Sequence, residues 1–465
     1  MQNQVTIGAK LRKIERRIDA QSLARWSCKL AGDYGDTLYD KAYQTTFYGT
    51  DLHDAPMLIG GAGRLLGMKV RVSRSAVIGE IDAKGRVVAH YEEKADGAYE
   101  SIPFAKMFQM CTRLRGELKS WIGEEFYQVP FVGGIKSIYL SDEEQEIANY
   151  YLPEAEIFGD GTLFQLFTAE HLDEPSLPDE AHKESYQLAR LKEKTDYPDR
   201  PLYRERMEKV LDILRRDEAQ KVVVARKCKI VPQEGFDLFQ FTAYELDKYY
   251  QEYFYLFRQG DEAYWTGISP EIIMKQDGRK AVTKPLAGTR KKSDDPAENE
   301  KIRQNLTSTS KDIIEHEHAL YFMENQLKSA GIGEVRIDKN KTVLETPYTF
   351  HIKSELSMDL NEGVSCFDVI GALYPPATVW GIPVDRTETI LKETEPFARE
   401  YFPGVYGHWN FKDEADAALI IRSAKVEQDA VCVYAGGGIV KYSDIDSEFD
   451  ETVNKMRPLV SYFAE

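Results

Sequence analysis

The strand candidates of this chain follow one another at hairpin-like spacing, which limits the folds that it can adopt. β-branched and apolar runs predict strands at Val70–Ser73, Arg86–Tyr91, Gln220–Arg226, Ala417–Ala424 and Ala430–Ala435. The last two stand close together, as the arms of a hairpin do. Long helical stretches interleave with the strands. The pattern therefore favours a mixed α/β content with antiparallel sheets over a doubly wound parallel sheet.

Helical periodicity is clearest in the second half of the chain. The segment 203–216 has one apolar face, and charged residues fill the other. The apolar face consists of Met207, Val210, Leu211 and Leu214. The segment Ser308–Ser329 has serine and threonine at its start and a glycine just past its end, both typical of helix ends. Further helices are expected over Ser101–Ile122 and from about Asp446 towards the C-terminus.

Nothing along the 465 residues forces a division into domains. The segment richest in chain breakers, Asp173–Asp179, is short and is typical of a surface loop. With 42% hydrophobic and 29% charged residues, the composition is that of a globular protein with a large core. We expect a single domain over residues 1–465.

The charge balance excludes several classes of partner. A formal net charge of −17 disfavours both nucleic acid and an anionic membrane surface. The sequence shows no apolar run long enough to span a bilayer and no signal-peptide pattern at its N-terminus. Its five scattered cysteines fit reduced thiols, so we expect a cytoplasmic protein. An anionic substrate would need locally placed positive groups against this net charge.

Two carboxylate pairs at helical spacing are the first candidates for chemistry. Asp312 and Glu315 form one pair, Glu448 and Glu451 the other, and Lys455 lies one turn beyond the second. Residues three apart share a helix face, and carboxylate oxygens are ligands for hard cations. Either pair alone is better explained as a solubilising surface. Together, with a glycine-rich loop expected before the second pair and a lysine beside it, they favour a metal site.

Other polar residues stand at unusual places but leave alternatives open. Lys221 begins an apolar run, either reaching solvent at the strand's end or acting as a buried general base. Arg422 interrupts another apolar run, as an internal ion pair or as a carboxylate-binding group. The glycines 436–438 can present N–H groups to an anion, or only make a turn. Glu271, after a serine and a proline, carries no signal of its own.

Several segments, taken in order, resemble the motifs of the chorismate-utilising enzyme family. They are Gln220–Val223, Ser269–Glu271, Pro285–Arg290, Lys311–His316, His351, Tyr374–Pro383, Ile421–Ser423, Ala435–Val440 and Glu448–Lys455. The family includes anthranilate synthase component I, aminodeoxychorismate synthase component I, isochorismate synthase and salicylate synthase. The resemblance is strong over residues 201–465. It is weak over residues 1–200, where Pro130–Gly134 carries it.

The resemblance implies an α+β fold with large antiparallel sheets at the core and helices packed outside. It also implies a cleft beside the core in which Mg²⁺ binds the ring carboxylate of chorismate. The implied metal-binding residues are Glu315 and Glu451, with Asp312 and Glu448 holding the water ligands. The implied substrate-binding residues are Gly288, Thr289, Arg422, Gly436, Gly437, Gly438 and Lys455.

Members of the family differ in their nucleophile. Ammonia users resemble one another in having glutamine where this chain has Lys221, and lysine there marks the water users. The resemblance implies that Lys221 activates water for attack at C2 and that Glu271 protonates the departing C4 hydroxyl. Ala287 stands where aminodeoxychorismate synthases carry lysine, and the sequence shows no glutaminase segment. We therefore expect no obligatory amidotransferase partner.

Thr378 bears on the product. Isochorismate-only enzymes usually have alanine at the matching position, whereas the enzymes that release pyruvate have threonine. The resemblance therefore implies salicylate formation, with His351 helping to hold the pyruvyl side chain. The alternatives are an isochorismate synthase, or an anthranilate synthase component I-like subunit that needs an amidotransferase. Three departures from the salicylate synthase pattern are Phe402 for tyrosine, Asp312 for glutamate and Lys353 for a small or apolar residue.

Overall fold

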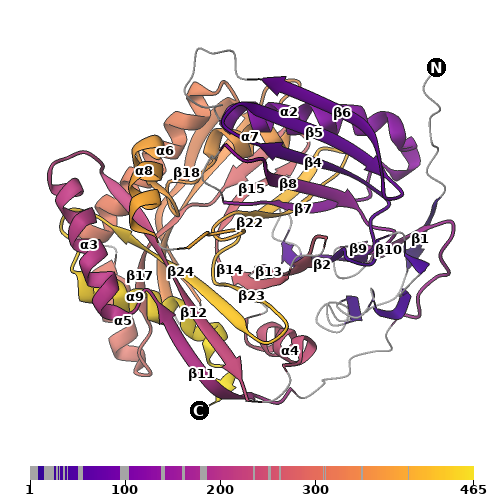
Figure 1. The fold of residues 1–465 in the computed structure, drawn as a ribbon. Helices are drawn as coiled ribbons and strands as arrows, with labels where there is room; N and C mark the ends of the chain where they lie inside the picture. The colour runs from indigo at the N-terminus through magenta and orange to yellow at the C-terminus, as the bar shows by residue number, and fades with distance from the viewer. Residues whose placement is uncertain are drawn as a thin grey trace.

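Two large sheets form the described part of this computed structural model (Figure 1). The structure describes residues 9–14, 26–27, 30, 32–34, 37–38, 40–50, 56–94, 104–137, 142–159, 163–177, 186–233, 236–249, 253–260, 263–306, 308, 310–346, 349–395 and 397–464. The side chains of Thr289, Asp312 and Glu315 lie outside the description, although their backbones are within it.

The first sheet contains 13 strands in the described residues. In order across the sheet they are β1 (Ala9–Ile14), β10 (Phe164–Ala169), β9 (Ala155–Gly159), β3 (Pro56–Ala62), β2 (Gln44–Thr50), β13 (Tyr253–Arg258), β14 (Tyr264–Ser269), β23 (Ser423–Val426), β24 (Val431–Ile439), β12 (Lys221–Pro232), β11 (Ala189–Tyr197) and β25 (Phe463–Ala464), with β20 (Gly381–Ile382) beside β12. Neighbours are antiparallel except β11 and β25, which run parallel.

The second sheet contains 12 described strands, and all of its pairs are antiparallel. In order they are β17 (Leu286–Lys291), β19 (Thr349–Leu360), β16 (Lys280–Thr283), β15 (Ile272–Asp277), β22 (Glu414–Leu419), β21 (Val405–Trp409), β7 (Phe131–Ile135), β8 (Gln145–Leu152), β4 (Leu66–Val72), β5 (Ala76–Ala83) and β6 (Arg86–Lys94), with β18 (Gly333–Glu345) beside β19.

The main core lies between the inner faces of the two sheets. Phe257 on β13 stacks on Tyr406 on β21, with ring centroids 4.0 Å apart. The hydroxyl of Tyr406 also bonds the hydroxyl of Thr45 on β2 at 2.6 Å. Phe47 and Trp265, from the first sheet, are fully buried in the same cluster. Burying an aromatic side chain of this kind contributes roughly 1.5–3 kcal/mol, so this interface supplies much of the force that joins the sheets.

Helices cover the outer faces of both sheets. Those on the second sheet are α2 (Phe104–Leu118), α5 (Pro296–Leu306), α6 (Ser310–Ser329) and α7 (Cys366–Leu373). Those on the first are α4 (Leu238–Tyr249), α8 (Val384–Thr394) and α9 (Ile445–Val460), with α3 (Arg200–Arg215) packed on α9. Short 3₁₀ turns occur at Lys119–Trp121 and Glu124–Phe126. The α+β class and the layered arrangement expected from the sequence are confirmed.

Local signals placed two of the longer helices well. Asp199 caps α3 by accepting a hydrogen bond from the Leu202 N–H at 3.0 Å. The apolar face predicted for this helix is the buried one. Helix α6 ends as the sequence predicts, because Gly331 adopts a positive φ of 67° just beyond it. The helix expected over 101–122 ends earlier, because α2 stops at Leu118, and residues 101–103 lie outside the described part.

One expected strand is wrong, and the difference creates the site. The sequence predicts a single strand over Ala417–Ala424. Instead β22 ends at Leu419 in the second sheet, and β23 begins at Ser423 in the first. Arg422, in between, has φ +46°. A left-handed residue breaks an extended strand, so the chain crosses from one sheet to the other at Ile420–Arg422.

Candidate active site

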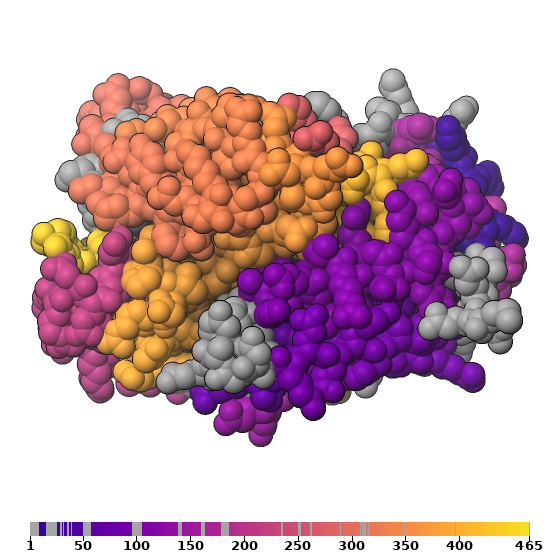
Figure 2. All heavy atoms as spheres, turned by 90° about the horizontal axis from the view of Figure 1, so that it is seen from above, coloured from indigo at the N-terminus to yellow at the C-terminus, as the bar shows by residue number. Residues whose placement is uncertain are grey.

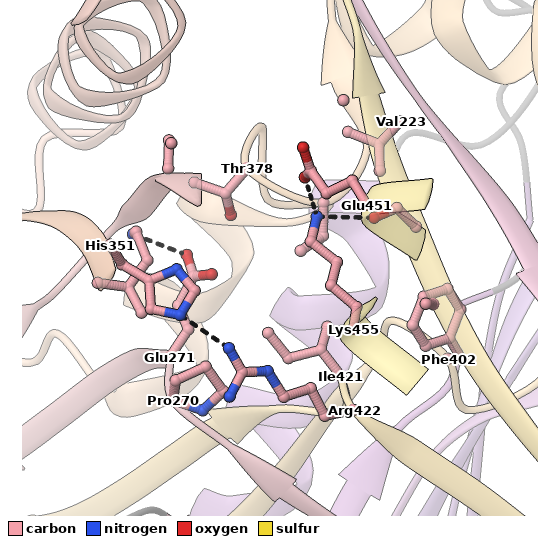
Figure 3. A pocket seen from close by; sticks show the side chains of 17 residues that line it. Val223, Pro270, Glu271, His351, Thr378, Phe402, Ile421, Arg422, Glu451 and Lys455 are labelled. Carbon is pink, nitrogen blue, oxygen red and sulfur yellow. Dashed lines mark hydrogen bonds and ion pairs between the residues drawn. The ribbon is translucent and has the colours of Figure 1, made fainter. Parts of the chain in front are cut away.

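A cavity lies beside the crossing at Ile420–Arg422 and is lined by residues from both sheets (Figure 3). The empty space between its walls is about 740 Å³, part of it open to solvent. The lining residues are Val223, Pro270, Glu271, Leu286, Ala287, Gly288, His351, Thr378, Val379, Phe402, Ile421, Arg422, Ala435, Gly436, Gly438, Glu451 and Lys455. Nine of the candidate site residues expected from the sequence are therefore brought together here.

Glu271 presents a buried carboxyl to this cavity. It follows β14 and precedes β15, and only 4% of it is exposed. The Leu286 N–H donates to its carboxylate at 3.3 Å. Burial raises the pKa of Glu271 to about 7, opposed by the nearby Thr378 hydroxyl, by the Leu286 N–H and by the charges of Lys221 and Lys455. Near neutral pH this carboxyl is therefore poised to give up or accept a proton.

His351 and Arg422 form a bonded pair in the cavity wall. His351 lies on β19, and its Nε2 stands 2.7 Å from an Nη atom of Arg422. Burial, then the charges of Arg422 and Lys455, holds the pKa of His351 well below its ordinary value. The imidazole is therefore neutral, and its Nε2 accepts the guanidinium N–H. This orients the Arg422 fork, whose same Nη lies 3.4 Å from the Thr349 hydroxyl.

The three glycines expected to form a loop are part of strand β24. Gly436 pairs with Ala225, Gly437 with Val224 and Gly438 with Val223 of β12. The Gly436 carbonyl accepts from Lys455 at 2.9 Å, so it points away from β12. In an extended strand the N–H and C=O of one residue share an edge. The main-chain groups of Gly436 and Gly438 therefore face the cavity, while those of Gly437 belong to the ladder with β12.

Gly437 faces helix α9 instead. A Cβ built on it would lie 3.5 Å from Thr452 on α9 and 3.7 Å from the Glu448 carbonyl. These are ordinary van der Waals distances, so a methyl group would fit there and Gly437 simply lies in contact with α9. It is not among the residues that line the cavity.

Helix α9 brings the second carboxylate pair and Lys455 to the site. Asp444 caps the helix by accepting from the Ser447 N–H at 2.9 Å. Lys455 reaches both Glu451, at 2.8 Å, and the Gly436 carbonyl. Glu448 is buried and accepts from the Ser443 hydroxyl at 2.7 Å. These three residues also line a second hollow, together with Arg290, Lys291, Thr349, Arg422, Ser447, Asp450, Asn454 and Pro458.

The first carboxylate pair lies on α6, which packs on β17. Strand β17 contributes walls to both hollows. The side chains of Asp312 and Glu315 lie outside the described part. Among the side chains that are described, no three His, Cys, Asp or Glu residues gather as a metal cluster would. The four-carboxylate site therefore stays a prediction.

Lys221 is buried rather than solvent-exposed. It is the first residue of β12, it is 1% exposed, and its Nζ donates to the Thr378 carbonyl at 3.5 Å. It is not among the residues that line the cavity, but its charge acts on Glu271. Lys221 and Glu271 thus lie on two sides of Thr378, whose side chain points into the cavity (Figure 3).

Gly288 makes the bend that shapes strand β17. Its φ is +63°, and the register with β19 shifts between Ala287 and Thr289. A positive φ favours glycine, and this bulge turns the strand towards the cavity. The backbone of Thr289 pairs with His351, so the two lie opposite one another in the sheet.

Sequence reasoning missed the apolar walls. Val223, Leu286, Val379, Ile421 and Ala435 line the cavity, yet in sequence they cannot be told from core residues. Phe402, noted as a departure, does line it and stacks on Tyr434 with centroids 5.6 Å apart. Lys353 pairs with Leu286 in the sheet and is not one of the lining residues.

A family model for chorismate binding enzymes matches residues 141–461. The chain belongs to this family. Among its curated relatives is an anthranilate synthase component 1 from Neisseria gonorrhoeae, 30% identical over 253 residues, covering 52% of this chain and 51% of that protein. Another, from Aquifex aeolicus, is 33% identical over 195 residues, covering 42% of this chain and 40% of that protein. The matches thus span about half, or less, of the length of these relatives.

Solved structures of chorismate-family proteins share the fold. The menaquinone-specific isochorismate synthase MenF of Escherichia coli superposes with a TM-score of 0.73 and 18% identity, covering 99% of this chain and 95% of that one. Anthranilate synthase component I of Streptococcus pneumoniae gives 0.66 and 17%, covering 87% and 92%. No helix in the described ranges has the length and apolar character needed to cross a membrane.

Proposed function

We propose that this chain converts chorismate to isochorismate, and then to salicylate and pyruvate, with Mg²⁺ as its cofactor. The observation that carries the proposal is the placing of Lys221 and Glu271 around Thr378. One is a buried amine and the other a carboxyl with a pKa of about 7. A carboxyl in the cavity wall and an amine buried beside Thr378 suit the exchange of a hydroxyl group between two ring carbons.

Substrate binding would rest on the positive and main-chain groups. Arg422 and Lys455 lie in the cavity wall of a chain whose net charge is −17. Both can pair with carboxylates, of which chorismate carries two. The Gly436 and Gly438 N–H groups would add donors without a side chain. The neutral His351 holds the Arg422 guanidinium in a fixed orientation.

The residues present fit a magnesium ion. Glu448 and Glu451 lie one turn apart on α9 and line the same hollow, and carboxylate oxygens suit Mg²⁺. Glu451 would ligate the ion with Glu315, while Asp312 and Glu448 would hold its waters. When bound, the ion would neutralise the ring carboxylate of chorismate. Lys455, now paired with Glu451, would then be available to the substrate.

The first reaction would use only this chain's acid and base around the ring. Lys221 would take a proton from water as the water oxygen bonds to C2. The C4–O bond would break as Glu271 gives its proton to the leaving hydroxyl, and the double bonds would shift between those carbons. The product, isochorismate, is an isomer of chorismate. Water is released as water is added, so the atoms balance.

The second reaction would be an elimination. The bond between the ring and the enolpyruvyl oxygen would break, while the C2 hydrogen moves to the methylene carbon of that group. This leaves salicylate and pyruvate. The Thr378 side chain, which points into the cavity, would hold the pyruvyl group in the geometry that the transfer needs.

A second candidate is an anthranilate synthase component I-like subunit. It is favoured by the curated relatives, which carry that name at 30–33% identity. Such a subunit would take ammonia, supplied by an amidotransferase partner or by ammonium salts. Lys221 opposes this candidate, because ammonia needs no such base.

Product analysis separates these candidates. Purified protein would be incubated with chorismate and Mg²⁺, with and without ammonium, and its products separated by chromatography. Salicylate and pyruvate in equal amounts, without ammonium, are the expected result. Isochorismate without pyruvate would mean that the chain catalyses the first reaction alone and does not make salicylate. Anthranilate formed only with ammonium would overturn the proposal.

A further inference from the structure

Strand β12 has a gap along one of its edges. Strand β24 pairs with one edge from Val222 to Ile230. On the other edge, β20 pairs at Lys221–Val222 and β11 only from residue 227 onward. Residues 223–226, in between, have no strand neighbour on that edge within the described chain. Their backbone groups need other partners, because the strand is buried there.

Side chains and a loop carbonyl fill this gap. The Val223 N–H donates to the Trp380 carbonyl at 2.7 Å, and the Val223 carbonyl accepts from Arg399 at 2.6 Å. The Ala225 N–H donates to the Glu395 carboxylate at 2.7 Å. Glu395 and Arg399 thus replace a missing strand, and they do so beside Val223, which lines the cavity.

Glu395 and Arg399 are themselves a fully buried ion pair. Two hydrogen bonds join them, from Nε at 2.7 Å and from Nη2 at 2.5 Å, and their side chains are 0% and 1% exposed. The guanidinium also lies 5.0 Å from the centroid of the Trp380 ring. The sequence does not indicate this pair, because a Glu and an Arg four apart are typical of an exposed helix end.

The pair connects three parts of the active site. Trp380 stands two residues after Thr378, whose carbonyl accepts from Lys221. The Arg399 carbonyl accepts from the Phe402 N–H at 3.0 Å, and Phe402 lines the cavity. The segment with Thr378 and the strand with Lys221 therefore meet at the Arg399 guanidinium, and the turn with Phe402 is bonded to the main chain of the same residue.

We propose that the Glu395–Arg399 pair positions Thr378 against Lys221 and Glu271, and so sets the rate of the reaction in this cavity. Neither residue touches the cavity, so both act through Trp380 and Val223. The effect on the isochorismate-to-salicylate ratio rests on the proposed function. The effect on kcat does not, because it applies to any conversion of chorismate in this site.

The test compares Arg399→Lys with Arg64→Lys. Lysine keeps a positive charge beside Glu395, but it loses the second donor nitrogen and the flat face on Trp380. Arg64 is the matched control, because it is equally buried and pairs with Asp82 and Asn149, which do not line the cavity. Melting temperature, kcat and KM for chorismate would be measured for both variants.

We expect Arg399→Lys to lower kcat on the order of tenfold or more, with KM nearly unchanged, because small misplacements of reacting groups are costly. Isochorismate should also build up relative to salicylate. Arg64→Lys should lower the melting temperature and leave kcat unchanged. Faster backbone hydrogen exchange in the peptides with Val223 and Trp380 should accompany the loss in Arg399→Lys.

Two results would overturn the positioning role. One is faster exchange at Val223 and Trp380 with kcat unchanged, since the pair would then serve stability alone. The other is unchanged exchange in both peptides. If Arg399→Lys does not fold, the double variant Glu395→Gln with Arg399→Gln removes both charges and gives the same readouts. A wild-type product other than isochorismate or salicylate contradicts the proposed function, while kcat still tests the pair.

Discussion

Glu271 is a carboxyl whose protonation changes near neutral pH, and this gives a test of its role. Replacing it by glutamine should lower chorismate turnover by about 10²–10⁴-fold, since the acid is lost. In the wild type, the rate should fall as pH rises through about 7, where the carboxyl ionises. A pH–rate profile that stays flat from about pH 5 to about pH 9 would remove Glu271 from this role.

The burial of Glu271 also predicts how the stability of the fold changes with pH. The folded pKa of Glu271, about 7, lies above the ordinary value of about 4.3. The folded state therefore binds more protons between those values, and Glu271 destabilises the fold progressively as pH rises through that window. Glu271→Gln should raise the melting temperature at about pH 8 more than at about pH 4. Equal shifts at both pH values would show that the carboxyl is not buried in its charged form.

The proposed role of Lys221 as a base can be tested by removing its amine. Lys221→Gln keeps a polar side chain of similar length, so the fold should survive while the water reaction falls by about a hundredfold or more. The matched control is Lys229→Gln, on the same strand but exposed. Steady-state rates with chorismate, without ammonium, provide the measurement. A Lys221→Gln enzyme within a few-fold of wild type would mean that another group activates water.

The proposed role of Thr378 in the second reaction can be tested by following isochorismate. Thr378→Ala removes the hydroxyl beside Glu271 and leaves the base and acid in place. We expect isochorismate to accumulate while chorismate consumption falls only modestly. Thr378→Ser keeps the hydroxyl and should behave like the wild type. Chromatography over time measures all three compounds, and unchanged salicylate output from Thr378→Ala would contradict this role.

At the scale of elements, the sequence patterns predicted where strands lie better than which strands they pair with. The apolar run from Gln220 and the face of α3 were readable because burial leaves a clear periodicity. The break at Arg422 was not, because a single left-handed residue has no signature when it is an arginine. Gly436–Gly438 were expected to form a loop, since glycine clusters usually mark turns. Here the three glycines belong to strand β24, of which one side faces the cavity and Gly437 contacts helix α9.

The candidate site was recoverable for a different reason. Most of its polar residues stand in ordered motifs, so resemblance brought together positions that are far apart in the chain. The apolar walls and the Glu395–Arg399 pair carry no such motif. Their roles depend on which strand edges lack a neighbour, and only the three-dimensional arrangement shows that.

The proposed metal-binding role of helix α9 can be tested by replacing its carboxylates. Glu451→Gln should abolish turnover, because the amide cannot offset the charge of a cation. Glu448→Gln should do the same. Asp446→Asn is the control, since Asp446 is on the same helix but pairs with Arg200 and Arg204 of α3. Activity titrated against EDTA and restored with Mg²⁺ is the measurement, and full activity in excess EDTA would rule out the metal.

At the scale of the whole molecule, the two halves of the chain share both sheets. Strand β7 pairs with β21, and β2 pairs with β13. Figure 2 shows the early and late parts of the chain side by side on one face. Residues 1–200, where the family resemblance is weak, thus share strand pairs with the later residues in both sheets, as the predicted single domain requires.

This sharing predicts the behaviour of a fragment. Residues 201–465 expressed alone would expose the edges of β13 and β21 and the apolar face between the sheets, and unpaired edges of this kind favour aggregation. We expect the fragment to be poorly soluble and to melt without a cooperative transition. Circular dichroism and size-exclusion chromatography would show this. A monodisperse, cooperatively melting fragment would mean that the later residues fold alone.

The wall built from the backbone of β24 limits how such an enzyme can diverge. Main-chain N–H and C=O groups are the same for every residue except proline, which lacks the N–H, so most codon changes leave the donors and acceptors of Gly436 and Gly438 in place. Inherited change in the product would then come mainly through the side chains in the cavity wall, such as Thr378 and Phe402. A mutational library at those codons would measure how much of the product choice these side chains control.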